Sequence, residues 1–194
     1  MSITRRNFLG YSSLFLAACA SPTVAIADDD EMPPPRTCGP ATADNIEGPF
    51  YKSGAPSRAV LVAPKDAGTR FALDGRILTT TCEPIAKAEL DVWQADATGA
   101  YDNDGYRFRG TLVTDDQGRY QLRTIIPGRY LNGKTYRPAH LHVKVRARGR
   151  DELTTQLYFA GDPYNAKDPF IVDSLIMKHR DEKGARRASF DFVL

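Results

Sequence analysis

The sequence predicts an all-β fold, an antiparallel β-sandwich of the prealbumin or immunoglobulin type with long loops and little helix. Short segments of alternating apolar and polar residues follow one another from residue 71 to the C-terminus, a pattern typical of strands that bury one face. Turn-forming sequences separate them, most clearly DDQG at 115–118 and GDP at 161–163. The length of 194 residues, of which 42% are hydrophobic, suits one well-buried domain.

Residues 1–27 have the features of an export signal peptide. The sequence RRNFL at 5–9 precedes an apolar run up to residue 18, which resembles a twin-arginine signal peptide and is too short to span a bilayer. AIA at 25–27 fits signal cleavage, whereas LAAC at 16–19 resembles a lipobox that would acylate Cys19. We therefore expect a periplasmic or extracellular protein, either soluble or held at the membrane by a lipid anchor at Cys19.

Residues 28–44 predict an extended linker, because an acidic run is followed by three prolines. The folded domain is then expected over residues 45–194. Once Cys19 is assigned to the signal or to a lipid, Cys38 and Cys82 remain as a pair. An oxidising compartment would allow a disulfide that ties the N-terminal arm to the domain, and two unrelated buried thiols are the alternative.

The expected strands, in chain order, cover residues 71–80, 90–95, 108–114, 120–126, 140–147, 153–159 and 189–193. A short segment at 169–178 is the helical candidate. No internal repeat or second domain is visible in the sequence.

The charge balance argues against nucleic acid as a partner. The formal net charge is +2, and the two arginines at 5 and 6 are the charged residues of the first 27 positions. Without that segment, basic and acidic residues are equal in number. Nucleic-acid binding depends on the neutralisation of phosphates by a basic surface, which this composition does not indicate.

Two of the three histidines, His140 and His142, are one residue apart on an expected strand. Side chains alternate along a strand, so these two share one face while Leu141 and Val143 point to the other, toward the core. Two adjacent imidazoles suit a shared metal ion. An ordinary hydrogen-bonded or surface pair is the alternative.

Tyrosines are the other candidate ligands, because no cysteine or HExxH sequence lies near the histidine pair. A phenol has a reference pKa of about 10 and binds a metal as phenolate only when a strong Lewis acid displaces its proton. This chemistry favours ferric iron over zinc or magnesium. Each tyrosine could instead be a packing element, and the pattern alone does not select among the five near these strands: Tyr101, Tyr106, Tyr120, Tyr130 and Tyr136.

Four longer motifs together resemble one family. They are DVWQADATGAYDNDG, TLVTDDQGRYQLRTIIPGRY, RPAHLHVKV and TTQLYFAGDP. In this order they are similar to the intradiol ring-cleavage dioxygenases, the family of protocatechuate 3,4-dioxygenase and catechol 1,2-dioxygenase. The similarity extends from GPFY at 48–51 to the C-terminal FDFVL.

The resemblance implies one non-haem Fe(III) per chain, held by two tyrosinates and two histidines. By their place in the motifs these ligands are Tyr101, Tyr130, His140 and His142. The active-site arginine of the family corresponds to Arg137, and a glutamine near the iron corresponds to Gln156. Three further residues are expected to line the substrate pocket: Ile171, Leu131 and Asn132.

The implied activity is that of an oxidoreductase which inserts both atoms of O2 into a ring of the catechol or protocatechuate class. Cleavage between the two hydroxyl-bearing carbons yields a muconate-type diacid. Tyr130 is implied to leave the iron and act as a base, and Arg137 to stabilise negative charge on the ring. The expected partners are a small aromatic diol and O2, and a homo-oligomer is left open.

Two alternatives are retained. A transthyretin-like or carbohydrate-binding β-sandwich without catalysis would explain the strands and the export address, but not the order of the tyrosines, arginine and histidines. Extradiol cleavage would instead need Fe(II) held by two histidines and one carboxylate.

Overall fold

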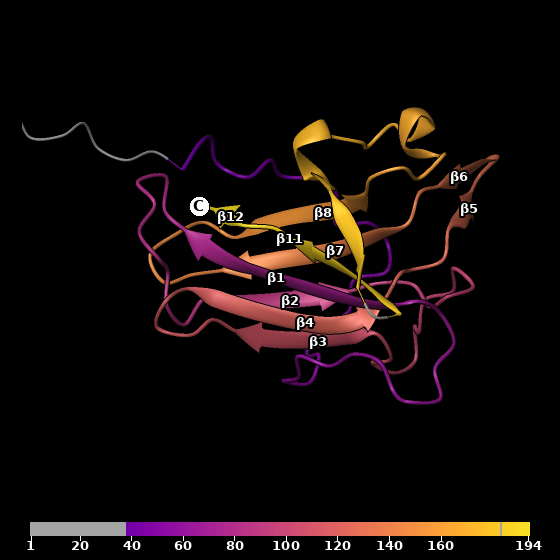
Figure 1. Cartoon of the computed structure of the whole chain (residues 1–194), viewed down its shortest axis with the longest axis horizontal. Helices are drawn as coiled ribbons and strands as arrows, with labels where there is room; N and C mark the ends of the chain where they lie inside the picture. The colour runs from indigo at the N-terminus through magenta and orange to yellow at the C-terminus, as the bar shows by residue number, and fades with distance from the viewer. Residues whose placement is uncertain (1–37, 183) are drawn as a thin grey trace, which may run out of the picture. The chain divides into compact units, whose positions relative to one another are not determined.

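The computed structural model describes residues 38–182 and 184–194, which form two five-stranded sheets and a two-stranded hairpin (Figure 1). One sheet has the order β10-β11-β1-β12, with β4 also paired to β1, and the other has the order β3-β2-β7-β8-β9. The hairpin is β5-β6. The strands are β1 (Arg70–Leu78), β2 (Glu89–Trp93), β3 (Arg109–Val113), β4 (Arg119–Ile125), β5 (Tyr130–Asn132), β6 (Thr135–Arg137), β7 (His140–Arg146), β8 (Leu153–Phe159), β9 (Ile176–Met177), β10 (His179–Glu182), β11 (Ala185–Ser189) and β12 (Phe192–Val193).

The core lies between the two large sheets and confirms the predicted all-β sandwich. Leu141 and Val143 of β7 are fully buried in one cluster with Phe71 and Leu73 of β1. Phe71 also meets Phe159 of β8 edge to face, with ring centroids 5.0 Å apart. The apolar face of β7 is therefore used for packing, and its other face is left for the histidines.

The sheets are mixed rather than wholly antiparallel. Strand β1 pairs in parallel with both β11 and β12, and β8 pairs in parallel with β9. The expected strand at 189–193 is divided between β11 and β12, because the side-chain Oδ1 of Asp191 accepts the hydrogen bond of the Arg76 N–H at 2.8 Å. The C-terminal segment therefore pairs with β1 in two separate stretches, first as β11 and then as β12.

The prediction of a helix at 169–178 is wrong. Only a 3-10 helix at Asp173–Leu175 forms there, followed directly by β9. Val172, at its N-terminal end, has extended backbone angles, as a β-branched residue prefers. A second 3-10 helix covers Asn165–Lys167, and no α-helix occurs in the described part of the chain.

The N-terminal arm is fastened to the domain from residue 38 onward. Cys38 and Cys82 form a disulfide, so the alternative of two unrelated buried thiols is wrong. The N–H of Thr42 donates to the carbonyl of Val193 at 2.9 Å. Residues 38–44 lie in the segment predicted as a linker, yet they are held because their backbone finds partners in the domain. The expected signal peptide, Cys19 and the rest of that linker lie outside the described residues.

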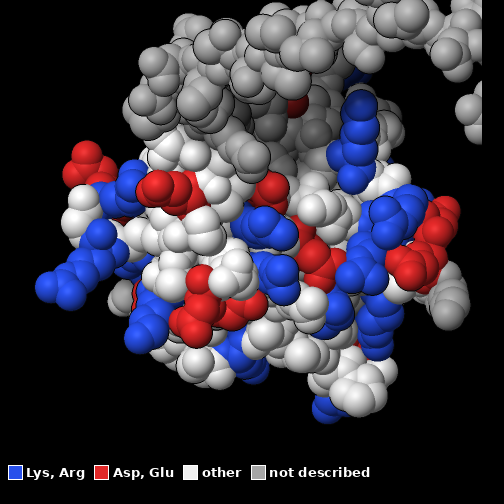
Figure 2. Space-filling view, turned by 60° about the vertical axis from the view of Figure 1, so that its left-hand side comes forward, with Lys and Arg blue, Asp and Glu red and all other residues white. Residues whose placement is uncertain are grey.

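Charged side chains of both signs are interspersed on the face seen in Figure 2, and no single basic area is visible there. Among the described residues, no helix is long and apolar enough to cross a membrane.

Candidate metal centre

His140 and His142 lie on the face of β7 that points away from the sandwich core, and both are almost completely buried. Their ring centroids are 4.8 Å apart. The Nδ1–H of His140 donates to the carbonyl of Pro138 at 2.7 Å. Because a carbonyl can only accept, this bond assigns the proton to Nδ1 and leaves the lone pair of Nε2 free for a metal ion.

Burial keeps both imidazoles neutral. Desolvation, followed by the charge of Arg137, lowers the pKa of His140 to about 4. Desolvation, followed by the neighbouring His140, lowers the pKa of His142 well below its ordinary value. A neutral imidazole is the form that coordinates metal, so the fold itself maintains the ligand form near neutral pH.

Tyr101 and Tyr130 come from two loops that meet through glycine backbone. Gly99 and Gly128 each stand two residues before a tyrosine. A Cβ on Gly99 would lie 2.3 Å from the carbonyl oxygen of Arg129, and a Cβ on Gly128 would lie 2.4 Å from the backbone nitrogen of Gly99. The loops can approach this closely only without side chains at these positions, and the approach brings the two phenols together.

The four rings surround one small region. The ring centroid of Tyr130 is 5.7 Å from that of Tyr101 and 5.6 Å from that of His140. The hydroxyl of Tyr101 is 3.5 Å from Nε2 of His140. Tyr101 and His142 meet edge to face, with centroids 6.2 Å apart. The residues selected by the motif order are therefore neighbours in space, although they span more than forty positions of the chain.

The phenol of Tyr101 is protonated in the absence of a bound cation. Burial, followed by the proximity of Tyr130, raises its pKa above the ordinary value. Such a phenol can act as an anionic ligand only where a strongly positive ion compensates the cost of its buried charge.

Aromatic rings close the site on two sides. Phe50, from the arm that leads into the domain, stacks on Tyr101 with centroids 4.2 Å apart. Trp93 of β2 stacks on His142 with centroids 4.8 Å apart and an interplanar angle of 9°. Nδ1 of His142 is buried and has no hydrogen-bond partner in residues 38–182 and 184–194. The two stacking contacts fix the ring planes of Tyr101 and His142 and help to exclude water from the site.

Arg137 lies beside Tyr130, across the β5-β6 hairpin from it. Its Nη1 is 3.5 Å from the Tyr130 hydroxyl, and its Nη2 donates to Oε1 of Gln156 at 2.8 Å. Gln156 is the cross-strand partner of His142, and its Nε2 donates to the carbonyl of Ile46 at 2.8 Å. The arginine and the glutamine named by the motifs therefore form one hydrogen-bonded unit next to the four rings.

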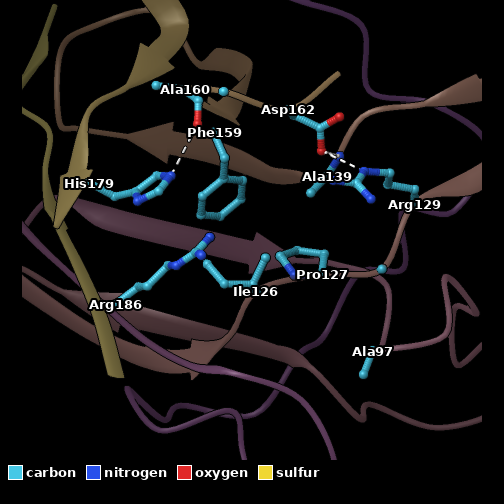
Figure 3. Close-up of a pocket in the computed structure, with 12 residues that line it drawn as sticks. Ala97, Ile126, Pro127, Arg129, Ala139, Phe159, Ala160, Asp162, His179 and Arg186 are labelled. Atoms are coloured by element: carbon cyan, nitrogen blue, oxygen red, sulfur yellow. Dashed lines mark hydrogen bonds and ion pairs between the residues drawn. The ribbon is translucent and has the colours of Figure 1, made fainter. Parts of the chain in front are cut away.

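A single carboxylate joins the segments that lead into two candidate ligands. Oδ2 of Asp162 accepts from Nε of Arg129 at 2.8 Å and from the N–H of Ala139 at 3.1 Å. Arg129 and Ala139 immediately precede Tyr130 and His140. Figure 3 shows Asp162, Arg129 and Ala139 at a pocket of about 460 Å³. None of the four candidate ligands lines this pocket. Asp162 thus joins the segment that leads into Tyr130 to the segment that leads into His140.

The donor set fits ferric iron. Two phenols and two neutral imidazoles around one buried region provide the hard oxygen and nitrogen donors that Fe(III) accepts, including tyrosinate. Two tyrosinates and a hydroxide would balance its charge. Among residues 38–182 and 184–194, no group of three or more His, Cys, Asp or Glu side chains is placed to hold a metal. The two-histidine, one-carboxylate set required by the extradiol alternative is therefore not assembled in that part of the chain.

The three predicted pocket residues differ in their exposure. Ile171 is half-buried and packs against the core, whereas Leu131 is 56% exposed on the hairpin and Asn132 is exposed at its end. Two of the unselected tyrosines have other bonds: the Tyr106 hydroxyl donates to Ser53, and that of Tyr120 to Phe190. The third, Tyr136, is exposed and packs against Tyr164.

Several residues around the site could not be identified from sequence. Phe50 lies within the GPFY motif, which signalled only the start of ordered structure. Arg109 is buried and donates from Nη1 to the carbonyl of Phe50 at 2.7 Å and from Nη2 to that of Asp102 at 2.9 Å. Asp168 pairs with Arg137 at 2.9 Å. No local pattern marks Arg109 or Asp168, because Phe50 and Arg137, their partners beside the site, are 59 and 31 positions away in the chain.

Comparisons with known proteins agree with the motifs. A family model described as "Dioxygenase" matches residues 46–194. A chlorocatechol 1,2-dioxygenase from Pseudomonas putida is 35% identical over 184 residues, covering 82% of this chain and 68% of that protein. A catechol 1,2-dioxygenase from Acinetobacter baylyi is 33% identical over 153 residues, covering 66% of this chain and 49% of that protein. The chain thus spans about half of the second relative.

One solved structure is matched over almost its whole length. The dioxygenase domain of a dioxygenase and carbohydrate-binding protein fusion from Streptomyces sp. SirexAA-E is 41% identical and superposes with a TM-score of 0.75. The match covers 80% of this chain and 98% of that domain.

Proposed function

Because the chain belongs to the intradiol ring-cleavage dioxygenase family, we propose that it uses non-haem Fe(III) to open a catechol-type ring with O2. The product is a muconate-type diacid. The observation that carries the proposal is the convergence of Tyr101, Tyr130, His140 and His142 in one buried region, with Arg137 beside Tyr130.

Ferric iron held by these four side chains would draw electron density from a chelated catecholate and so make the ring reactive toward O2. His140 and His142 remain as neutral ligands, since burial disfavours their protonation. Tyr101 is the permanent phenolate ligand, held in place by its stack with Phe50.

Tyr130 is the proton acceptor. Tyr130, a phenolate in the loaded site, would take up one of the two catechol protons as the diol binds, and the hydroxide of the loaded site would take up the other to become water, which would make the substrate a better chelator. Nη1 of Arg137 already lies 3.5 Å from this oxygen. Burial works against the charge of Arg137, but the hydrogen bond to Asp168 and the nearby Tyr130 together raise its pKa above the ordinary value. Arg137 is therefore a fixed cation that stabilises negative charge on the ring as the reaction proceeds.

The substrate is a catechol. The relatives are named for catechol, chlorocatechol and hydroxyquinol, each of which carries two adjacent hydroxyls on a benzene ring. Ile171 follows the Arg137-bound Asp168 by three residues, its N–H donating to the Asp168 carbonyl at 3.2 Å, and we assign it to the wall of the ring pocket. Leu131 and Asn132 follow Tyr130 on the exposed hairpin, and we assign them to the entrance of that pocket.

The test is a visible spectrum and an iron analysis of purified protein, followed by oxygen uptake with a panel of catechols. Tyrosinate bound to Fe(III) should colour the protein red to burgundy, and the products should absorb as muconates. A colourless, iron-free protein, or a yellow semialdehyde product, would contradict the proposal. Tyr101→Phe should lose colour and iron, whereas Tyr136→Phe, which removes an exposed hydroxyl, should retain both.

We also propose export by the twin-arginine route. The RRNFL sequence at 5–9 supports it, as does the Cys38–Cys82 disulfide, because disulfides persist in oxidising compartments. This route carries folded proteins, which would allow iron to be inserted before export. Cell fractionation after replacing both Arg5 and Arg6 by lysine tests it: the protein should be retained in the cytoplasm, and unchanged export would contradict the route.

A further inference from the structure

The carboxylate of Asp168 lies against the guanidinium of Arg137, and its side chain is completely buried. Its Oδ2 accepts from both Nε and Nη2 of Arg137, at 3.1 and 2.9 Å. Its Oδ1 accepts from the backbone N–H of Phe170 at 3.1 Å. Both oxygens are used, so the carboxylate is itself held by the chain that follows it.

The other contacts of Arg137 leave one nitrogen for the site. Nη2 also donates to Gln156 at 2.8 Å and to the Tyr158 hydroxyl at 3.2 Å. The guanidinium lies over the ring of Phe170, 4.8 Å from its centroid. Nη1 is the nitrogen that faces Tyr130. The three contacts of Arg137 with Asp168, Gln156 and Phe170 therefore set the direction in which Nη1 points.

A guanidinium is planar, so two bonds from adjacent nitrogens to one oxygen fix its position and its direction within the plane, and the Phe170 ring against its face fixes the tilt of that plane. The paired carboxylate also compensates the charge of Arg137, which would otherwise be buried without a partner. An asparagine in place of Asp168 would keep the size of the side chain but would not supply the charge.

We propose that Asp168 is a positioning residue for ring cleavage, which holds the plane of the Arg137 guanidinium so that Nη1 points to the place where Tyr130 and the bound diol meet. The inference rests on the proposed function, in which Arg137 stabilises charge on the substrate. Asp168 touches Arg137 and not the reacting atoms. Its effect on catalysis must therefore pass through Arg137.

The test is a double-mutant cycle on kcat, with Asp168→Asn, Arg137→Leu and the double variant, all loaded with iron. Asp168→Asn should lower kcat by about 10- to 100-fold, as expected when a group that orients an active-site residue is removed. In the Arg137→Leu background the same substitution should change kcat less than about twofold, because its target is gone. Equal losses in both backgrounds would overturn the proposal.

Iron content and the tyrosinate absorption band of Asp168→Asn should match those of the wild type, and so should the Kd for catechol titrated without O2. Asp74→Asn is the control for loss of an ion pair away from the site, since Asp74 pairs with Arg187 at 2.7 Å and with Arg123 at 3.3 Å, and its kcat should be unchanged. An equal loss of kcat in the control would show that any lost ion pair has this effect and would overturn the assignment.

Asp168→Glu serves if Asp168→Asn does not fold. It retains the charge but lengthens the side chain, so the protein should fold with a lowered kcat, and this loss should be absent in the Arg137→Leu background. A crystal structure of either variant should show Nη1 of Arg137 turned away from Tyr130, and an unmoved guanidinium would overturn the proposal. A wild-type protein that binds iron but cleaves no catechol would instead refute the proposed function, and the role of Asp168 with it.

Discussion

Removal of the disulfide between Cys38 and Cys82 should destabilise the domain strongly. The two cysteines are 44 positions apart. Closing a loop of that length lowers the chain entropy of the unfolded state, which corresponds to about 4 kcal/mol of stability at 25 °C. Replacing both cysteines by serine should therefore lower the free energy of unfolding by up to about that amount.

The closed loop contains the segment that covers the candidate metal centre. Asn45 donates to the carbonyl of Phe170 at 2.8 Å, the carbonyl of Ile46 accepts from Gln156, and Phe50 stacks on Tyr101. Loss of the disulfide should thus loosen the cover of the site before the whole domain unfolds. We expect faster release of iron to a chelator from the serine variant under conditions in which it is still folded.

Urea denaturation followed by fluorescence measures the effect. Trp93 is the single tryptophan of the chain and stacks on His142, so its emission reports on the site. The double serine variant should unfold at lower urea than the oxidised wild type. Reductant should shift the wild type to the same midpoint and leave the variant unchanged. A difference below about 1 kcal/mol between variant and oxidised wild type would refute the loop-closure reasoning.

Three further predictions concern the site. Arg137→Leu should keep iron and colour, lose most turnover, and lower the free energy of unfolding by about 3–5 kcal/mol because the buried Asp168 loses its partner; a denaturant midpoint like that of the wild type would contradict this ion pair. In metal-free protein the pKa of His140 is lowered to about 4 from 6.5, so the unfolded chain binds more protons below pH 6.5. The free energy of unfolding should then fall by about 3 kcal/mol between pH 6.5 and 4, and flat denaturation midpoints over that range would disprove it. Gly128→Ala would place a Cβ 2.4 Å from the nitrogen of Gly99, so it should separate the two tyrosine loops and weaken iron retention measured against a chelator.

The parts of the fold that could be predicted from sequence are those with a period of two and a buried face. Strand β7 is the best example, because Leu141 and Val143 pack in the core while His140 and His142 occupy the other face. Strand β10 could not be found this way: its sequence HRDE is polar and largely exposed, and its backbone partners come from β11. The β5-β6 hairpin was missed, although an Asn-Gly pair marks its turn.

The candidate site was predictable as far as its residues belong to motifs. Periodicity identified the histidine face, and the family resemblance named Tyr101, Tyr130 and Arg137. What sequence could not provide is the contact between the two loops and the pairing of Arg137 with Asp168, 31 positions away. Such contacts depend on how the strands are arranged in space and leave no spacing rule in the chain.

The pairing of Tyr130 with Arg137 across the β5-β6 hairpin limits how the tyrosine can move. Arg137 is anchored by Asp168 and Gln156, so the backbone opposite it is anchored as well. A swing of the whole hairpin would break these bonds, whereas rotation about the Cα–Cβ bond of Tyr130 would break none of them. Under the proposed function, displacement of Tyr130 by a diol would therefore need only rotation of its side chain, and the hairpin would keep its place.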